Sequence, residues 1–222
     1  MSNIFSNNSN IREVGKEVCM FDVVFVDFDG TLTDDSMRHY RCYCDIINDF
    51  GGNKISYDEY WNMKRMKSDV EELLIKSQFR GSYQKYYHEW IMRIEKEAYL
   101  QYEILRPGVH DVLALLKIKS KKLVLVSMRN NEDALKKQLQ DFAIIDFFDE
   151  IIVGNSQEGK RKKDLVFERG GKYLVLGDTE DDMCLADTIG AQMIAITSGV
   201  RDRKFLNAEK YVFEIRDVAY IL

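Results

Sequence analysis

Proline and cysteine are scarce in this chain of 222 residues. There is one proline, Pro107, and the four cysteines form no CxxC pair. Metal or redox sites built on paired cysteines are therefore not expected. A reduced, cytoplasmic protein is the simplest interpretation.

The chain also lacks an excess of positive charge and any long apolar run. It carries 32 basic and 37 acidic side chains, a formal net charge of −5. That balance offers no general attraction to nucleic acid or anionic membranes. No apolar run approaches the roughly 20 residues that a membrane-spanning helix needs, and "MSNIFSNNSN" has no secretory apolar segment. We therefore expect no nucleic-acid or membrane partner, and we interpret residues 1–20 as an N-terminal tail and lead-in. The oligomeric state is not indicated.

Short apolar runs, in contrast, recur along the chain. Five have the length of a strand: residues 22–27, 122–127, 150–153, 172–177 and 192–197. They are rich in Val, Ile and Leu and do not alternate with polar residues, which is typical of parallel strands buried on both faces. Helical patterns lie between them at 109–118, 131–142, near 164–169 and at 180–189. The alternation predicts an α/β fold with a Rossmann-like, doubly wound parallel sheet.

Residues 36–105 interrupt this alternation. The segment is charged and aromatic, has apolar residues at spacings of three and four, and contains no convincing strand. Arg106-Pro107-Gly108 ends it. We interpret it as an inserted α-helical domain, here called the insert, within a core made of residues 21–35 and 106–222.

Polar residues gather where the predicted strands end. The first strand runs into Asp27-Phe28-Asp29-Gly30-Thr31, the second ends at Ser127, and the fourth leads into "GDTEDD" with Asp178 and Asp182. A lysine cluster, Lys160, Lys162 and Lys163, follows the third strand. Ligands of parallel α/β sheets bind beyond these carboxyl ends.

Each feature alone has an ordinary structural interpretation. Asp-Gly is a common turn, an aspartate after a strand is a common helix cap, and "GKRKK" could be a solvated basic face. Together they are harder to explain, because carboxylates gathered at one sheet edge repel one another unless a metal ion lies between them.

These motifs resemble those of the haloacid dehalogenase-like hydrolase superfamily. "DFDGT" after an apolar strand is similar to its signature, "GDTEDDMCLADTIGA" to its acidic motif, and Ser127 and the lysine cluster fall where its other two motifs fall. The resemblance covers residues 22–34 and roughly 106–213. The position of the insert is that of the helical C1 cap of the family.

The resemblance implies a role for each residue of the site. Asp27 would be the nucleophile and form an aspartyl-phosphate, and Asp29 would be the general acid and base. Ser127 and one lysine would bind the transferring phosphoryl group. Lys162 fits the motif best, Lys163 is the alternative, and Lys160 fits less well.

The resemblance also implies a metal site and a substrate site. Mg²⁺ would be the cofactor, with four aspartates at the metal, Asp29 through its backbone carbonyl. The substrate would be a small phosphorylated metabolite. The implied metal-site residues are Asp27, Asp29, Asp178 and Asp182, and the implied substrate contacts are Gly30, Thr31, Met128 and Arg129.

The leading hypothesis is therefore a Mg²⁺-dependent phosphatase acting on a small phosphomonoester. A phosphomutase similar to β-phosphoglucomutase is the alternative on the same scaffold, and a catalytically idle binding module is a third possibility. The insert is expected to determine specificity, and its candidate contacts are Arg38, Arg41, Lys64, Arg65 and Arg80. The three histidines are interpreted as surface or packing residues.

Overall fold

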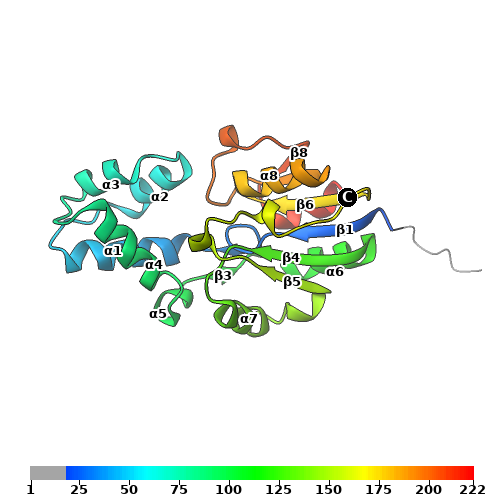
Figure 1. Ribbon diagram of the computed structural model, residues 1–222, viewed down its shortest axis with the longest axis horizontal. Helices are drawn as coiled ribbons and strands as arrows, with labels where there is room; N and C mark the ends of the chain where they lie inside the picture. The colour runs from blue at the N-terminus through cyan, green and yellow to red at the C-terminus, as the bar shows by residue number, and fades with distance from the viewer. Residues whose placement is uncertain (1–18) are drawn as a thin grey trace, which may run out of the picture.

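The computed structural model describes residues 19–222, with the side chain of Ser156 excepted. The predicted tail, residues 1–20, therefore lies almost entirely outside the described residues. The remainder forms a sheet domain and a helical insert at one end of it (Figure 1).

The sheet domain is built on six parallel strands in the order β5-β4-β1-β6-β7-β8. The strands are β1 (Phe21–Val26), β4 (Ser120–Ser127), β5 (Glu150–Val153), β6 (Tyr173–Gly177), β7 (Gln192–Ile196) and β8 (Lys210–Val212). The predicted fold class is confirmed, and the five predicted strands are present within two residues of their expected bounds. The sixth strand, β8, was not predicted, because only Val212 of its three residues is buried.

Helices cover the two faces of the sheet. They are α6 (Val109–Lys119), α7 (Glu132–Asp141) and α8 (Glu180–Ile189). Alternate residues of each strand enter two different cores: Val24 packs with α6 and α7 on one face, and Phe25 packs with α8 on the other. Burial on both faces explains why the strands read as continuous apolar runs.

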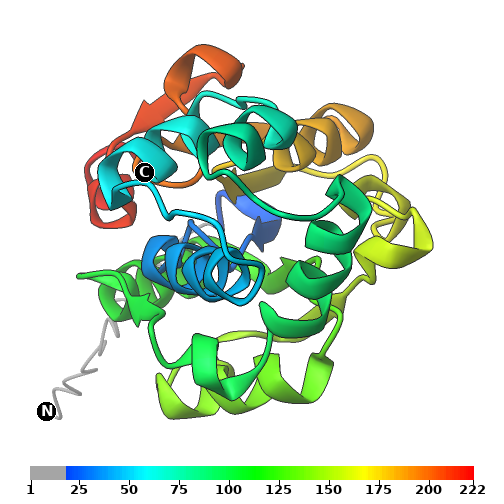
Figure 2. The same cartoon turned by 90° about the vertical axis from the view of Figure 1, so that its left-hand side faces the viewer.

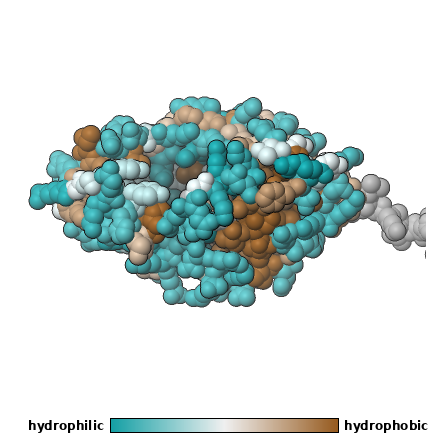
Figure 3. Space-filling view, viewed as in Figure 1, coloured by the Kyte–Doolittle hydropathy of each residue, from teal (hydrophilic) through white to brown (hydrophobic). Residues whose placement is uncertain are grey.

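The helix expected near 164–169 is absent, and this prediction was wrong. A single 3₁₀ turn spans Lys162–Asp164, and irregular chain follows up to β6. Val166 is buried against the sheet, while Phe167 remains 78% exposed. Lys162 is fixed at the site, and Gly170, with φ +75°, turns the chain eight residues later. The stretch between them is too short for a helix. The sheet face beneath it is thinly covered, and an apolar patch is visible there (Figure 3).

The insert is a helical bundle, as predicted. Its helices are α1 (Ser36–Asp49), α2 (Tyr57–Arg65), α3 (Val70–Lys76), α4 (Tyr83–Arg93) and α5 (Glu97–Leu100). They share an aromatic core in which Tyr43 and Tyr60 stack with ring centroids 4.6 Å apart. The aromatic residues of the insert therefore serve mainly to hold this bundle together.

Two crossing segments join the insert to the sheet domain. They form the short antiparallel pair of β2 (Thr33–Asp34) and β3 (Ile104–Leu105), which the sequence did not predict. Both segments leave from the side of the sheet where the strand arrows end (Figure 1), and Figure 2 shows the insert in front of these ends. In residues 19–222, no helix combines the length and apolarity needed to cross a membrane.

Candidate active site

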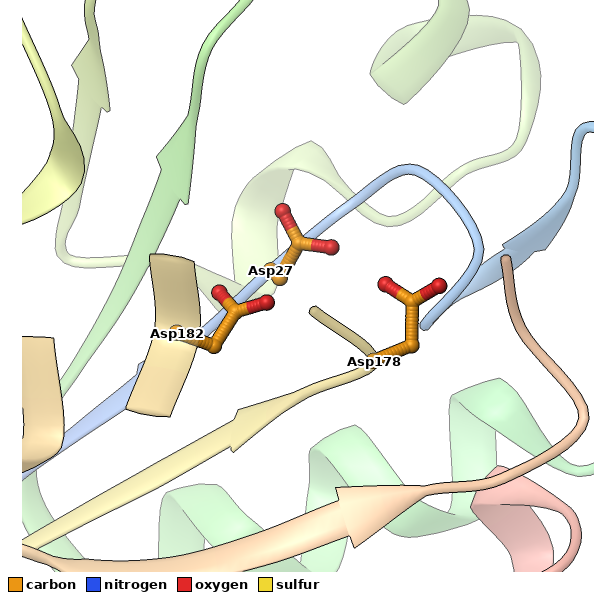
Figure 4. Close-up of side chains that lie close together, drawn as sticks. All are labelled: Asp27, Asp178 and Asp182. Carbon is orange, nitrogen blue, oxygen red and sulfur yellow. The ribbon is translucent and has the colours of Figure 1, made fainter. Parts of the chain in front are cut away.

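Three aspartates converge at the carboxyl edge of the sheet. Asp27 follows β1, Asp178 follows β6, and Asp182 lies in the first turn of α8. One carboxylate oxygen of each lies within 4.8 Å of the others, and all three residues are buried (Figure 4). The order of strands explains this, because β1 and β6 are neighbours and end in register.

The cluster gathers like charges away from water, which is electrostatically unfavourable. Burial, followed by the neighbouring carboxylates Asp182 and Asp178, raises the pKa of Asp27 well above its usual range, although Lys162 opposes this. Burial and then Asp182 raise the pKa of Asp178 to about 7. A divalent cation bound to the oxygens would relieve this repulsion, so the donor set fits a hard cation such as Mg²⁺.

Lys162 is the lysine that the structure brings to the cluster. Its Nζ donates to Asp182 Oδ1 at 2.6 Å and to Asp27 Oδ1. Burial alone would lower the pKa of Lys162, but Asp182 and Asp27 raise it. Lys160 is exposed and pairs with Glu158, and Lys163 is half-buried and does not line the site cavity.

Gly30 and Thr31 support the carboxylates and do not line the cavity. The buried hydroxyl of Thr31 lies 3.1 Å from Asp27 Oδ2 and 3.3 Å from Asp178 Oδ1. Gly30 has φ +75°, and a Cβ there would lie 2.4 Å from Asp178 Oδ2, so no other residue fits. Gly199, which the sequence did not single out, is similar, since a Cβ would lie 2.1 Å from the same oxygen.

Asp29 is held by two arginines. Arg129 binds it with both Nε (2.8 Å to Oδ2) and Nη2 (2.6 Å to Oδ1), and Arg38 of α1 lies 2.7 Å from Oδ1. Burial alone would raise the pKa of Asp29, but Arg129 and Arg38 hold it well below its usual range. Glu103 accepts from Arg129 at 2.8 Å and completes the network. In this arrangement Asp29 is ionised.

Ser127, at the end of β4, has a fully buried hydroxyl. Its Oγ has no hydrogen-bond partner among the residues that the structure describes. Buried hydroxyls are normally paired, so this one is available to a ligand. Met128 and Arg129, which follow it, line the cavity at the site, whereas Ser127 itself does not.

This cavity has a volume of about 310 Å³ and lies between the sheet domain and the insert. The insert contributes Arg38, His39, Trp90 and Glu95 to its wall. Glu95 accepts from the backbone N–H of Asn130 and Asn131 at 3.0 and 2.7 Å, which ties the insert to the loop after β4. The insert therefore closes over the site.

Of the five cationic residues of the insert that were candidates for substrate contacts, one lines the cavity. Arg38 lines the cavity, whereas Arg65 donates to the carbonyls of Thr197 and Gly199 and so docks the insert on the sheet domain. Arg41 stacks on Tyr102. Lys64 and Arg80 do not line the cavity either.

His39 was interpreted as a packing or surface residue, but it also lies at the cavity. The ring packs near Trp61 and Trp90, but it also lines the cavity, and its Nε2 lies 3.2 Å from Asp35 Oδ2. Burial lowers the pKa of His39 to about 4, although Asp35 opposes this. The spacing of Asp35 and His39, four residues apart at the start of a helix, was a signal that sequence reasoning could have used.

The low pKa of His39 predicts a loss of stability in acid. Between pH 6.5 and 4 the histidine of the unfolded chain, with a pKa near 6.5, is protonated, whereas His39 of the folded protein stays neutral. The free energy of unfolding is therefore full above pH 6.5 and falls as the pH is lowered toward 4. At pH 5 the loss is on the order of 2 kcal/mol. We expect His39→Gln to lose less stability than wild type between pH 7.5 and 5, as measured by urea unfolding. The exposed His88→Gln should behave like wild type. Equal losses in all three proteins would contradict the assignment.

The fold and the site together define an α/β enzyme with a carboxylate cluster at the carboxyl edge of its sheet. The family model described as haloacid dehalogenase-like hydrolase matches residues 21–183. The chain belongs to this family, and the resemblance found in the motifs is confirmed.

Several known proteins are similar to this chain. A protein provisionally named pyrophosphatase PpaX, from Caldanaerobacter subterraneus subsp. tengcongensis, is 25% identical over 90% of this chain and 92% of its own. A haloacid dehalogenase-like family hydrolase from Streptococcus pneumoniae has a TM-score of 0.71 at 20% identity, covering 91% and 99% of the two chains. A structure provisionally titled β-phosphoglucomutase, from Thermotoga maritima, has a TM-score of 0.64 at 18% identity, covering 90% and 97%. The two structures show the likeness of fold alone.

Proposed function

We propose that this protein is a Mg²⁺-dependent phosphatase that hydrolyses a small phosphomonoester through an aspartyl-phosphate on Asp27. The observation that carries the proposal is the buried cluster of Asp27, Asp178 and Asp182, to which Lys162 is bound. The unpaired hydroxyl of Ser127 lies at the end of β4, the strand next to β1. Anionic and cationic groups thus meet at the end of β1, and a hydroxyl group lies at the end of the adjacent strand. This is the arrangement that phosphoryl transfer requires.

Each group has a task in the proposed reaction. A carboxylate oxygen of Asp27 attacks phosphorus, and the bond between phosphorus and the leaving oxygen breaks. Lys162 and Ser127 bind the phosphoryl oxygens as charge develops on them. A bound Mg²⁺, held by Asp27, Asp178, Asp182 and the backbone carbonyl of Asp29, would offset the repulsion between carboxylate and phosphate.

Asp29 would move the protons. It would protonate the leaving oxygen, then take a proton from the water that attacks the aspartyl-phosphate, so that phosphate and free Asp27 result. The two arginines now hold Asp29 ionised. We therefore propose that a substrate in the cavity loosens the contact of Asp29 with Arg38 or Arg129, so that Asp29 takes up a proton from solvent before the first step.

A phosphomutase would differ only in the acceptor, which would be a second substrate oxygen in place of water. Release of inorganic phosphate from a panel of phosphorylated metabolites with Mg²⁺ tests the proposal. Isomerisation of a sugar phosphate without release would favour the mutase, and no reaction of either kind would favour an idle binding module. The cytoplasmic location remains a prediction.

Removal of the metal is expected to abolish activity. EDTA should stop phosphate release, Mg²⁺ should restore it, and Ca²⁺ should inhibit, because its longer and looser coordination disturbs the attacking geometry. Asp178→Ala should weaken Mg²⁺ binding more than Asp182→Ala. The reason is that Asp182 already binds the ammonium group of Lys162 at 2.6 Å, whereas Asp178 accepts, among the described residues, only from neutral donors, the Thr31 hydroxyl and the backbone N–H of Val200.

Calorimetric titration of Mg²⁺ into the two variants and wild type measures this difference. Full activity in excess chelator would refute the mechanism. Tighter Mg²⁺ binding by Asp178→Ala than by Asp182→Ala would reverse the assigned roles of the two aspartates.

A further inference from the structure

Three wall residues of the cavity come from the start of α1 and the residue before it. Asp35 is the residue before the helix, and Arg38 and His39 lie one turn later. All three line the cavity that also contains Asp27 and Lys162. Asp35 and Arg38 are 3% and 4% exposed, so water reaches them little.

Each of these residues keeps a buried polar atom without a partner. Within the part of the chain that the structure describes, Asp35 Oδ1, Arg38 Nε and His39 Nδ1 have no hydrogen bond. Arg38 Nη1 has no hydrogen bond either, but it lies 3.3 Å from Glu103 Oε2 and forms an ion pair with it. Other atoms of the same side chains are engaged, since Asp35 Oδ2 faces His39 Nε2 and Arg38 Nη2 binds Asp29. Unpaired buried polar atoms are rare, and three of them on one cavity wall indicate that a ligand pairs with them.

The donor or acceptor character of the three atoms determines which groups a ligand must offer them. His39 has a lowered pKa and is neutral near pH 7, and its Nε2 faces a carboxylate, which places the proton on Nε2 and leaves Nδ1 as an acceptor. Asp35 Oδ1 is a second acceptor, because the neighbouring His39 and Arg38 lower the pKa of Asp35 although its burial opposes this. Arg38 Nε is a donor. A hydroxyl group both donates and accepts, so adjacent hydroxyls would satisfy this set.

The charge of the wall excludes an anionic leaving group. Its two arginines are already paired: Arg129 and Arg38 both bind Asp29, and both lie within 3.3 Å of Glu103. Asp35 and Glu95 add negative charge to the same wall. A carboxylate or a second phosphate would meet repulsion there, because each cationic side chain of the wall, Arg38, Arg129 and Lys162, already lies next to a carboxylate.

We propose that the site selects phosphomonoesters with a neutral, hydroxyl-bearing leaving group, as in sugar and polyol phosphates, and that Asp35, Arg38 and His39 bind its hydroxyls. This inference rests on the proposed phosphatase function. It sets the chain apart from a hydrolase of pyrophosphate, whose leaving group is charged.

A matched substrate set tests the inference. The wild-type protein with Mg²⁺ would be given a hexose 6-phosphate, glycerol 3-phosphate, phosphoglycolate, pyrophosphate and an aryl phosphate. We expect kcat/KM for the better of the two hydroxylated substrates to exceed that for phosphoglycolate and pyrophosphate by about tenfold or more, since unpaired polar atoms discriminate strongly. A preference for phosphoglycolate or pyrophosphate would overturn the inference.

Variants of the wall residues test whether they cause the preference for hydroxylated substrates. His39→Phe keeps a ring near Trp61 and Trp90 but removes both nitrogens. His88→Phe, at an exposed position of α4, is its control. His39→Phe should lower kcat/KM for the hydroxylated substrate about tenfold more than for the aryl phosphate. Asp35→Asn should do the same, compared with the exposed Asp58→Asn. Equal losses on both substrates would mean that these residues support the fold and not the leaving group.

Binding separates this inference from the proposed function. The Asp27→Asn protein, which should not turn over, would be titrated calorimetrically with hexose 6-phosphate and phosphoglycolate in Mg²⁺. At least tenfold tighter binding of the sugar phosphate supports the inference even if no substrate is hydrolysed, an outcome that would refute only the phosphatase. Equal or reversed affinities overturn it even if the aryl phosphate is hydrolysed.

Discussion

An Asp27→Asn variant is expected to fold normally and to lose phosphatase turnover by about four orders of magnitude or more. The amide cannot attack phosphorus, so no aspartyl-phosphate can form. The fold should tolerate the change, because Asp27 lies in a buried group of like charges that raises its pKa. A neutral amide relieves part of that repulsion, and Lys162 keeps Asp182 as a partner. Phosphate release and thermal unfolding, measured on the same preparation, test both expectations.

The matched control is Asp58→Asn, the same substitution at an exposed position of α2. It should retain wild-type turnover. Fluoroberyllate with Mg²⁺, which resembles a phosphoryl group bound to a carboxylate, should stabilise the wild-type protein against heat and leave Asp27→Asn unchanged. If Asp27→Asn turns over near the wild-type rate, the nucleophile has been assigned to the wrong residue.

Much of the sheet domain could be predicted because its signals are local. A strand buried on both faces must be apolar along its whole length, as β1 and β4 are, and such a run is visible without any knowledge of its neighbours. Helix α8 begins and ends as predicted, since Thr179 and Asp182 form a capping box at its start and Gly190 ends it in the left-handed region. By contrast, β8 has three residues and β2 two, and such short strands depend on pairing partners far along the chain.

In the candidate site too, the residues placed by local signals could be predicted and those placed by contacts between distant segments could not. The positions of Asp27, Ser127 and Asp178 could be predicted, because each ends or directly follows a strand and parallel strands end at one edge. Glu103 and Glu95 carry no motif, and their contacts with Arg129 and with the loop after β4 exist only because the insert folds back over the sheet. The constraint on Asp29 was missed for this reason: Arg38 and Arg129 are 91 residues apart in the chain and meet only on the folded protein.

Replacement of Lys162 is expected to be the second most damaging change. Its ammonium group touches Asp27 and Asp182, so it lies where the phosphoryl group would be transferred from substrate to Asp27. Loss of a preorganised charge at such a position costs a factor of about 10²–10³ in kcat, or roughly 3–4 kcal/mol. Lys162→Ala should therefore lose this much activity, as measured by phosphate release at saturating Mg²⁺. Lys162→Met, which keeps the length of the side chain and not its charge, should lose a similar amount.

Lys160→Ala is the matched control, because Lys160 is exposed and its partner is Glu158. It should retain wild-type activity. Loss of Lys162 also leaves carboxylates unpaired, so part of its effect could act through the fold, since removing one partner of a buried ion pair is strongly destabilising. Thermal unfolding of each variant in Mg²⁺ separates the two causes: a catalytic role predicts low kcat in a protein that remains folded at the assay temperature.

If Lys163→Ala proves to be the damaging change, the lysine assignment is wrong by one residue. If no lysine of the cluster matters, the cluster does not act on the phosphoryl group at all, and the positive charge at the site must come from Arg38 or Arg129, which would then have to release Asp29 to provide it.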